Sequence, residues 1–208
     1  MTLYFASGNP HKKSEITKLF PGFTILLPSD AGICFAPEET GNSFMENARI
    51  KAAVLWESVK APVLADDSGL CVDSLNGGPG LYSARYGGGI SQENKNRLLL
   101  EEVHSVLVRT PDSGGKNPRS CRFVCAMVLM LAPCRFFAVQ ETLEGALVET
   151  LEDARGGQGF GYDPVFIPQG YKNTLAELDP EEKNRISHRG RAAYALDKII
   201  PLLYDNLV

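Results

Sequence analysis

The chain opens with the stretch TLYFASGNPHKK (residues 2–13), in which a short β-type run, a glycine turn and a helix start follow one another. Asn9 fits the N-cap position and Pro10 the first helical position, so a helix is predicted over residues 10–20. Farther along, helices and strands alternate, and strands then cluster in the middle of the chain. This order predicts an α/β fold with a mixed sheet rather than a purely doubly wound one.

The pattern beyond this opening predicts the remaining elements. A capping box of Ser43 and Glu46 begins a helix that is expected to reach residue 59. Asp179 caps a short helix, and Ser187 begins a terminal helix that is expected to run to about Tyr204. A further helix is expected at 92–108, strands at 23–27, 63–65, 70–72, 121–131, 136–140 and 142–148, and loops at 31–41, 76–80, 110–118 and 156–163.

The composition bounds the class of protein. With 208 residues, 44% hydrophobic and 22% charged, the chain is expected to form one domain over 1–208 with two lobes. The net charge of -4 argues against a nucleic-acid polymer as partner, although a small anion in a local basic pocket remains open. Five cysteines without a CxxC pair are typical of core residues in a reducing compartment, and no apolar run is long enough to span a membrane. We therefore expect a cytoplasmic protein.

Two adjacent carboxylates carry the first chemical signal. Asp66 and Asp67 follow the apolar run 62–65, at the expected mouth of a buried strand, where carboxylates are costly unless they hold a metal or pair with a base. Neighbouring side chains on an extended backbone point to opposite sides, so only one is expected to face the site. Such a carboxylate could bind Mg²⁺ and take a proton from water. A turn-forming Asp-Ser-Gly would explain one aspartate but not the pair.

Basic residues from three places could face these acids. In the turn at 7–12, Gly8 would let a ligand approach the backbone, and Lys12 lies in a first helical turn that the macrodipole makes unfavourable for cations. Either an anion relieves this conflict or the lysines point into water. Lys51 falls inside the apolar stripe of the helix at 44–59, where it either snorkels or meets a phosphate. Near the end, His188 and Arg189 place donors at a helix start; the alternative is a surface cluster that answers nearby glutamates.

The last segment with candidate site residues is an aromatic loop flanked by glycines. In the stretch 159–164, Phe160 and Tyr162 alternate with glycines and are followed by Asp163 and a proline. A ring held in this way is suited to stacking on a planar base, although aromatics in loops also serve as local core plugs.

Several of these segments, in this order, resemble the inosine triphosphate pyrophosphatase (Ham1/RdgB-like) family of hydrolases that act on non-canonical purine nucleoside triphosphates. The resemblance spans almost the whole chain. It is carried by the segments SGNPHK (7–12), ETGNSFMENA (39–48), ADDSGL (65–70), GGPGLYSARY (77–86), GFGYDP (159–164) and SHRG (187–190). Ser7 stands where the family usually has threonine, which keeps the hydroxyl.

The resemblance implies an elongated α/β molecule with a long mixed sheet and a substrate cleft between two lobes, usually a homodimer. It implies Mg²⁺-dependent hydrolysis of ITP, dITP or XTP to the monophosphate and pyrophosphate. Asp67 would be the general base and, with Glu39, a metal ligand, although Glu38 is adjacent and the loop could shift by one residue. The substrate would be held by Ser7, Gly8, Asn9, Pro10, His11, Lys12, Lys51, Ser68, Phe160, Gly161, Tyr162, Asp163, Lys183, His188 and Arg189, with the last three reading the purine.

The implied selectivity has a physical basis. Donors aimed at a 6-oxo group leave an adenine 6-amino group without an acceptor, which is penalised when buried. GTP also has the 6-oxo group, so exclusion of its 2-amino group must be steric. Two other classes remain open: a sensor that binds nucleotides without hydrolysis, and a phosphatase that removes single phosphates.

Overall fold

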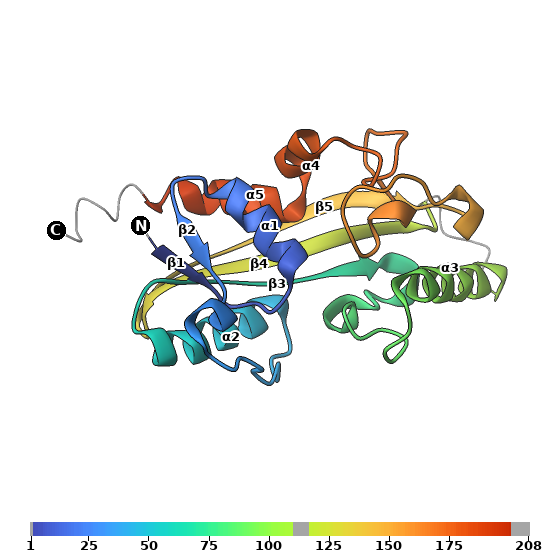
Figure 1. The fold of residues 1–208 in the computed structure, drawn as a ribbon. Helices are drawn as coiled ribbons and strands as arrows, with labels where there is room; N and C mark the ends of the chain where they lie inside the picture. Colours follow the sequence, from blue (N-terminus) through green and yellow to red (C-terminus); the bar gives the residue numbers. More distant parts are fainter. Residues whose placement is uncertain (1, 110–116, 201–208) are drawn as a thin grey trace. The chain divides into compact units, whose positions relative to one another are not determined.

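The computed structural model describes residues 2–109 and 117–200 (Figure 1). The described chain is of mixed α/β type, as expected. Its helices are α1 (Pro10–Leu19), α2 (Phe44–Val59), α3 (Gln92–Arg109), α4 (Pro180–Ile186) and α5 (His188–Asp197), and its strands are β1 (Thr2–Phe5), β2 (Thr24–Leu26), β3 (Val63–Val72), β4 (Ser120–Ala132), β5 (Arg135–Leu147) and β6 (Phe166–Pro168).

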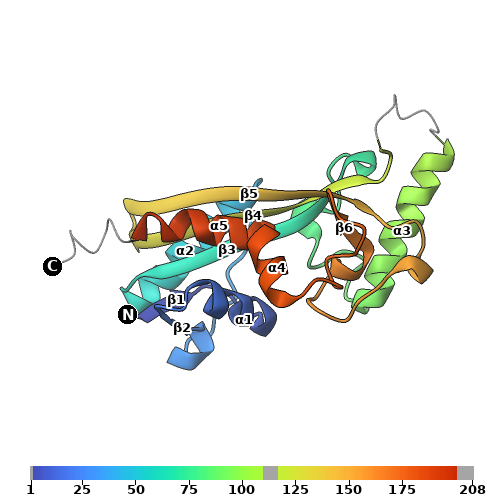
Figure 2. The same cartoon turned by 90° about the horizontal axis from the view of Figure 1, so that it is seen from above.

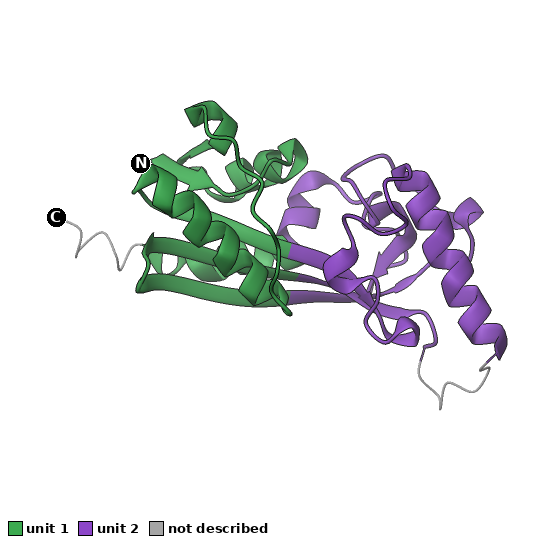
Figure 3. Cartoon of the chain, turned by 90° about the horizontal axis from the view of Figure 1, so that it is seen from below, with its two compact units in different colours: residues 1–67, 125–141, 188–208 green, residues 68–124, 142–187 purple. Residues whose placement is uncertain are grey.

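The strands form a six-stranded sheet in the order β2-β1-β3-β4-β5-β6. β1 pairs in parallel with both β2 and β3, whereas β5 and β6 are antiparallel, so the sheet is mixed. Within the described residues, the chain divides into two compact units (Figure 3). Unit 1 comprises residues 1–67, 125–141 and 188–208, and unit 2 comprises 68–124 and 142–187. The single domain, the elongated shape and the cleft between lobes stay predictions.

In unit 1, helices cover both faces of the sheet. Helices α1 and α5 contact each other on one face, and α2 lies on the other (Figures 1 and 2). Ile16 of α1 is fully buried against Phe5 of β1 and Leu196 of α5. On α2, Leu55 and Ala52 are buried, which follows from the apolar stripe along that helix. The sheet of unit 1 is therefore a central layer between two helical layers.

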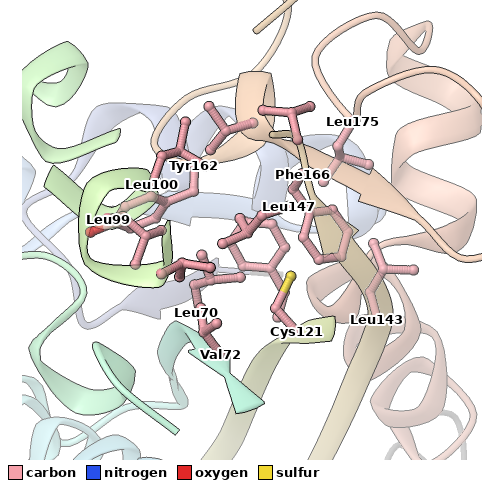
Figure 4. Close-up of a cluster of buried hydrophobic side chains, with 14 of the residues drawn as sticks. Leu70, Val72, Leu99, Leu100, Cys121, Leu143, Leu147, Tyr162, Phe166 and Leu175 are labelled. Atoms are coloured by element: carbon pink, nitrogen blue, oxygen red, sulfur yellow. The ribbon is translucent and has the colours of Figure 1, made fainter. Parts of the chain in front are cut away.

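Unit 2 has its own apolar core, which Figure 4 shows in close-up. Leu99 and Leu100 of α3 pack with Phe166 of β6 and Leu147 of β5 in this cluster. The rings of Phe123 and Phe166 lie 4.7 Å apart between centroids, within the usual range for aromatic pairs. A closed apolar core of this kind gives the loop at 159–164 a firm support.

Most predicted elements are confirmed, with small shifts at their ends. Asn9 caps α1 by accepting from the backbone N–H groups of His11 and Lys12, and Asp179 caps α4 in the same way. The capping box of α2 is only half as predicted. The Ser43 side chain accepts from the Glu46 N–H, but the Glu46 carboxylate accepts from the backbone of Asn42 rather than of Ser43.

The strand predictions contain the main errors. The prediction of separate strands at 63–65 and 70–72 is wrong, because β3 runs without a break from Val63 to Val72 and carries the acidic pair in its interior. Polar residues have low strand propensity, but neutralising partners allow these two to stay in a buried strand. The break predicted between 136–140 and 142–148 is also absent from β5, whose half-exposed residues tolerate a charge, and β6 was not predicted.

Other predictions have mixed outcomes. Cys121 and Cys125 are buried as expected, whereas Cys34 and Cys134 are exposed, so the prediction of core cysteines is wrong for these two. The terminal helix ends at Asp197, and the part of the prediction beyond residue 200 lies outside the described residues. The predicted loop at 110–118 lies outside them up to residue 116. Within the described part of the chain, no helix has the length and apolarity that crossing a bilayer requires.

Candidate active site

The candidate site of unit 1 lies where β1 ends and the neighbouring strand β3 continues. Phe5, the last residue of β1, pairs with Leu64 of β3, and the Ala6 N–H donates to the Leu64 carbonyl at 2.8 Å. β3 then extends past this point through Asp66 and Asp67. The carboxyl ends of strands are where open α/β sheets place ligands, because loops diverge there and leave room.

Asp66 faces the layer of α1 and α5. Its carboxylate accepts from Lys12 Nζ of α1 at 3.0 Å, and from Arg189 Nε and Nη2 of α5 at 3.1 and 2.7 Å. Arg189 Nη1 also donates to Glu15 Oε2 at 2.7 Å. The Cys125 thiol lies 4.0 Å from the same carboxylate, at the distance limit for a weak sulfur hydrogen bond. Asp66 therefore anchors two cations from helices far apart in the sequence.

Asp67 faces the opposite layer, as the alternation of side chains along a strand requires. Lys51 Nζ of α2 donates to Asp67 Oδ1 at 2.7 Å and to Glu39 Oε1 at 2.9 Å. The Asn47 amide donates to Asp67 Oδ2 at 3.4 Å and accepts from the Gly41 N–H at 2.8 Å, which fastens the loop before α2. Both carboxylates thus converge on one lysine, and Glu39 rather than the exposed Glu38 takes part.

Burial and charge act differently on the two aspartates. Burial would raise the pKa of Asp66, but the charges of Lys12 and Arg189 outweigh it and hold that pKa well below its ordinary value. Burial also raises the pKa of Asp67, and here the Lys51 charge does not fully compensate. The pKa of Lys51 is raised because, despite burial, Asp67, Asp66 and Glu39 all favour its charged form. Asp66 is therefore a fixed anion, whereas Asp67 is the more basic carboxylate of the two.

The turn before α1 presents hydroxyl and ammonium donors. Within it, the Ser7 hydroxyl accepts from the Asn9 N–H at 3.1 Å, and Asn9 Oδ1 caps the first two helical N–H groups. A Cβ added at Gly8 would meet no atom within 4 Å, so the space over this residue is open. The lysines do not simply point into water: Lys12 pairs with Asp66, and Lys13 pairs with Asp30 at 2.6 Å.

The oxygen atoms of Glu39 and Asp67 fit a divalent cation. One oxygen of each carboxylate lies within hydrogen-bond distance of Lys51 Nζ, so a single positive charge already pairs with both carboxylates. Among the residues that the structure describes, no group of three or more histidine, cysteine or acidic side chains is arranged to hold a metal ion by itself. Mg²⁺ does not need one, because it is usually bound by one or two carboxylates together with substrate phosphates and water.

A second cluster of predicted residues lies within unit 2. Asp163 Oδ2 accepts from the Phe160 N–H and from Lys183 Nζ, each at 2.8 Å, and Lys183 Nζ lies 5.4 Å from the centroid of the Phe160 ring. The Tyr162 hydroxyl donates to the Ser83 carbonyl at 3.0 Å. Tyr162 is therefore a buried core residue, in line with the structural alternative, whereas Phe160 is only half-buried.

The predicted residues thus fall into the two units. Asp67, Glu39, Lys51, Lys12 and Arg189 come together within unit 1, and Phe160, Asp163 and Lys183 come together within unit 2. Ser68 follows Asp67 on β3, and His188 is buried at the start of α5. The predicted role of Lys183, His188 and Arg189 as joint readers of a purine stays a prediction.

Two residues of the candidate site, Glu15 and Cys125, were not predicted from the sequence. Glu15 binds Arg189, and its position three residues after Lys12, on the same face of α1, was a usable signal. Cys125 was treated as an ordinary core residue, and nothing in its neighbourhood in the sequence indicates contact with Asp66. The alternative of a surface cluster does not fit His188 and Arg189, which are 6% and 3% exposed, and Glu182 pairs with Arg185 at 2.6 Å.

These features define an α/β protein that gathers lysines and carboxylates where its parallel strands end, as enzymes acting on phosphorylated ligands do. The chain belongs to the Ham1 family, whose profile matches residues 3–199. A relative from Treponema denticola, named dITP/XTP pyrophosphatase, is 51% identical over 200 residues, which cover 96% of this chain and 98% of that protein.

Solved structures agree with this membership. A Ham1 protein from Coxiella burnetii superimposes with a TM-score of 0.83 at 33% identity, covering 97% of this chain and 98% of that one. A protein from Mycobacterium abscessus named nucleoside-triphosphatase / dITP/XTP pyrophosphatase superimposes with a TM-score of 0.71 at 38% identity, covering 94% and 98%. The mixed α/β fold expected from the sequence is confirmed.

Proposed function

We propose that this protein hydrolyses non-canonical purine nucleoside triphosphates, namely ITP, dITP and XTP, to the nucleoside monophosphate and pyrophosphate. The observation that carries the chemistry is the convergence of Asp67 and Glu39 on Lys51. The substrate class rests on family membership and on the activity named for the relative from Treponema denticola.

In this proposal, Asp67 acts as the general base. A water molecule attacks the α-phosphorus and gives its proton to Asp67, while the bond from that phosphorus to the α,β-bridging oxygen breaks and pyrophosphate leaves. The raised pKa of Asp67, caused first by burial, makes it a better proton acceptor than its neighbour Asp66. Glu39 and Asp67 would hold Mg²⁺, which supplies charge stabilisation to the phosphoryl oxygens when bound.

The lysines have a complementary role. Lys51 and Lys12 would bind the triphosphate, together with the Ser7 hydroxyl and the open backbone at Gly8. Asn9, Pro10 and His11 belong to the same turn, and Ser68 would lie beside the substrate. Because each lysine is already held by a carboxylate, its position is set before the substrate arrives, which reduces the reorganisation required at the moment of reaction.

Base recognition would fall to the remaining predicted residues. Phe160 would stack on the purine, with Gly161, Tyr162 and Asp163 shaping the loop, and donors from Lys183, His188 and Arg189 would select a 6-oxo group. We further propose that the protein is cytoplasmic, where nucleotide pools lie, that it forms a homodimer, and that it has two lobes around one cleft.

A product assay tests the proposal. Purified protein is incubated with ITP, XTP, ATP and GTP, with and without Mg²⁺, and pyrophosphate and orthophosphate are measured separately. We expect pyrophosphate from ITP and XTP only when Mg²⁺ is present, and far slower turnover of ATP. Equal rates with ATP, or orthophosphate as the first product, would refute the assignment. Tight ITP binding without any product would identify a sensor instead.

A single substitution locates the base. Asp67→Asn should abolish turnover while leaving nucleotide binding nearly intact, because the amide keeps the shape but not the basicity. Asp73→Asn, which neutralises an acid of unit 2 that pairs with Arg122, is the matched control and should leave the rate unchanged. An active Asp67→Asn variant would remove Asp67 from the mechanism.

A further inference from the structure

The Phe160 loop is a conformationally demanding segment of unit 2. Gly159 and Gly161, on either side of Phe160, have φ values of +80° and +70°, which are readily adopted only by glycine. Two glycines leave the backbone with little stiffness of its own, so the position of the ring depends on the bonds that fasten the loop.

The first of these fastenings is the Asp163 carboxylate, which accepts from the Phe160 N–H at 2.8 Å. At the residue after Phe160, the Gly161 carbonyl accepts from Asn96 Nδ2 at 3.4 Å. Asn96 belongs to α3 and is only 5% exposed, although asparagine is mostly a surface residue. A buried carboxamide at this point requires hydrogen-bond partners, and the loop carbonyl is one of them.

The orientation of the Asn96 side chain is set by a second carboxamide. Gln92, one helical turn earlier on α3, donates from Nε2 to Asn96 Oδ1 at 3.0 Å. This bond occupies the oxygen end of Asn96 and leaves its NH₂ end directed at Gly161. The two residues therefore form a relay in which each amide accepts from the one before it: Gln92 donates to Asn96, and Asn96 donates to the loop.

Asn96 connects α3 to the loop at Gly161, beside an open groove, whereas Tyr162 of the same loop is held with Leu99 and Leu100 in the core of unit 2. A groove of about 650 Å³ lies there, lined by Gln92, Asn96, Leu151, Phe160, Gly161 and Pro164. Open volume next to the ring means that apolar packing does not fix this side of the loop. On this side, the hydrogen bond from Asn96 Nδ2 to the Gly161 carbonyl holds the loop in place.

We propose that Asn96, oriented by Gln92, is a positioning residue for nucleobase recognition, because it fastens Gly161 and so fixes the Phe160 ring on which the base stacks. This inference rests on the proposed function for the presence of a base. It assigns to α3 a part in substrate selection, although neither side chain needs to touch the substrate.

The exposed member of the relay offers the sharpest test. Gln92→Glu places a carboxylate where the donor was, so that it attracts Asn96 Nδ2 and turns Asn96 Oδ1 toward the Gly161 carbonyl. The helix itself is not weakened, since a negative charge in a first turn is favourable. Asn94→Asp, an exposed change of the same charge in the same helical turn, is the matched control. Asn96→Leu removes the relay directly.

Steady-state kinetics with ITP and inhibition by pyrophosphate give two separate readouts. We expect Gln92→Glu and Asn96→Leu to raise KM for ITP about 2- to 10-fold, the range for losing one neutral hydrogen bond, with kcat changed less. Inhibition by pyrophosphate should be unchanged, because pyrophosphate has no base. A general structural defect would weaken both. Asn94→Asp should match the wild type.

The outcomes separate the two proposals. A wild type that does not release pyrophosphate from ITP refutes the proposed function. An active wild type whose KM is the same in Gln92→Glu as in Asn94→Asp refutes only the positioning role. Equal weakening of ITP and pyrophosphate binding in Gln92→Glu also refutes it, and this variant keeps the test decisive if Asn96→Leu does not fold.

Discussion

Asp66→Asn should lower the stability of the protein much more than Asp67→Asn, although the two residues are neighbours on one strand. The Asp66 side chain is 0% exposed and holds Lys12 and Arg189, so its neutralisation leaves the buried Arg189 and the half-buried Lys12 each short of a partner. Breaking a buried ion pair on one side costs about 3–5 kcal/mol. Glu15 still binds Arg189, so we expect a loss near the lower end, about 3 kcal/mol.

Asp67→Asn should cost far less. Burial already disfavours the charged form of Asp67, as its raised pKa shows, and Lys51 keeps Glu39 as a partner. We therefore expect a change in the free energy of unfolding within about 1 kcal/mol, near the median for single substitutions. Turnover of ITP should nevertheless disappear.

Urea unfolding followed by tryptophan fluorescence measures both variants. Trp56, the single tryptophan of the chain, donates from its indole to the Leu131 carbonyl at 2.9 Å and so reports on unit 1. A change in the midpoint at constant slope gives the stability difference directly. The reasoning is refuted if Asp67→Asn is as unstable as Asp66→Asn, or if Asp66→Asn unfolds at the wild-type midpoint.

Three further predictions concern backbone strain, a buried hydroxyl and the metal. Gly156→Ala should cost about 2–4 kcal/mol in urea unfolding, because a Cβ at φ +82° would lie 2.2 Å from the Ala176 carbonyl oxygen, whereas Gly22→Ala, with open space around it, should be neutral. Burial raises the pKa of Tyr162 to about 12, so the folded state keeps a proton that the unfolded state loses above about pH 10; stability should fall from pH 10 to 12 in the wild type and less steeply in Tyr162→Phe. Chelation by EDTA should abolish turnover, and excess Mg²⁺ should restore it, while the thermal midpoint without nucleotide stays constant to within about 2 °C; a large midpoint shift would indicate a structural metal.

The sequence predicted the helices best, because their signals are local. Asn9 with Pro10, Ser43 with Glu46, and Asp179 each mark a helix start through side chains that bond to the nearest N–H groups. Lys51 was expected inside the apolar stripe of α2, and it is 8% exposed in the structure; that it meets a phosphate stays a prediction. These predictions needed only the spacing of a few residues.

The strands were harder, because their stability depends on partners distant in the sequence. Nothing near Asp66 shows that Arg189, 123 residues later, neutralises it and lets β3 continue. β6 contains three residues and exists through pairing with β5, so no local pattern defines it. The relay from Gln92 to Gly161 was likewise hidden, since it links a helix to a loop 65 positions away.

The order of synthesis along the chain determines when the ion pair between Asp66 and Arg189 can form. Unit 1 is assembled from segments that lie far apart in the sequence, and α5 follows every other helix and strand that the structure describes. Until Arg189 emerges, Asp66 has Lys12 as its ion-pair partner and the more distant charge of Lys51, but not the guanidinium that binds it through two N–H groups. A nascent chain that stops before α5 therefore lacks one of the two helices of this layer and a neutralising cation, and unit 1 completes its folding only after α5 has been made.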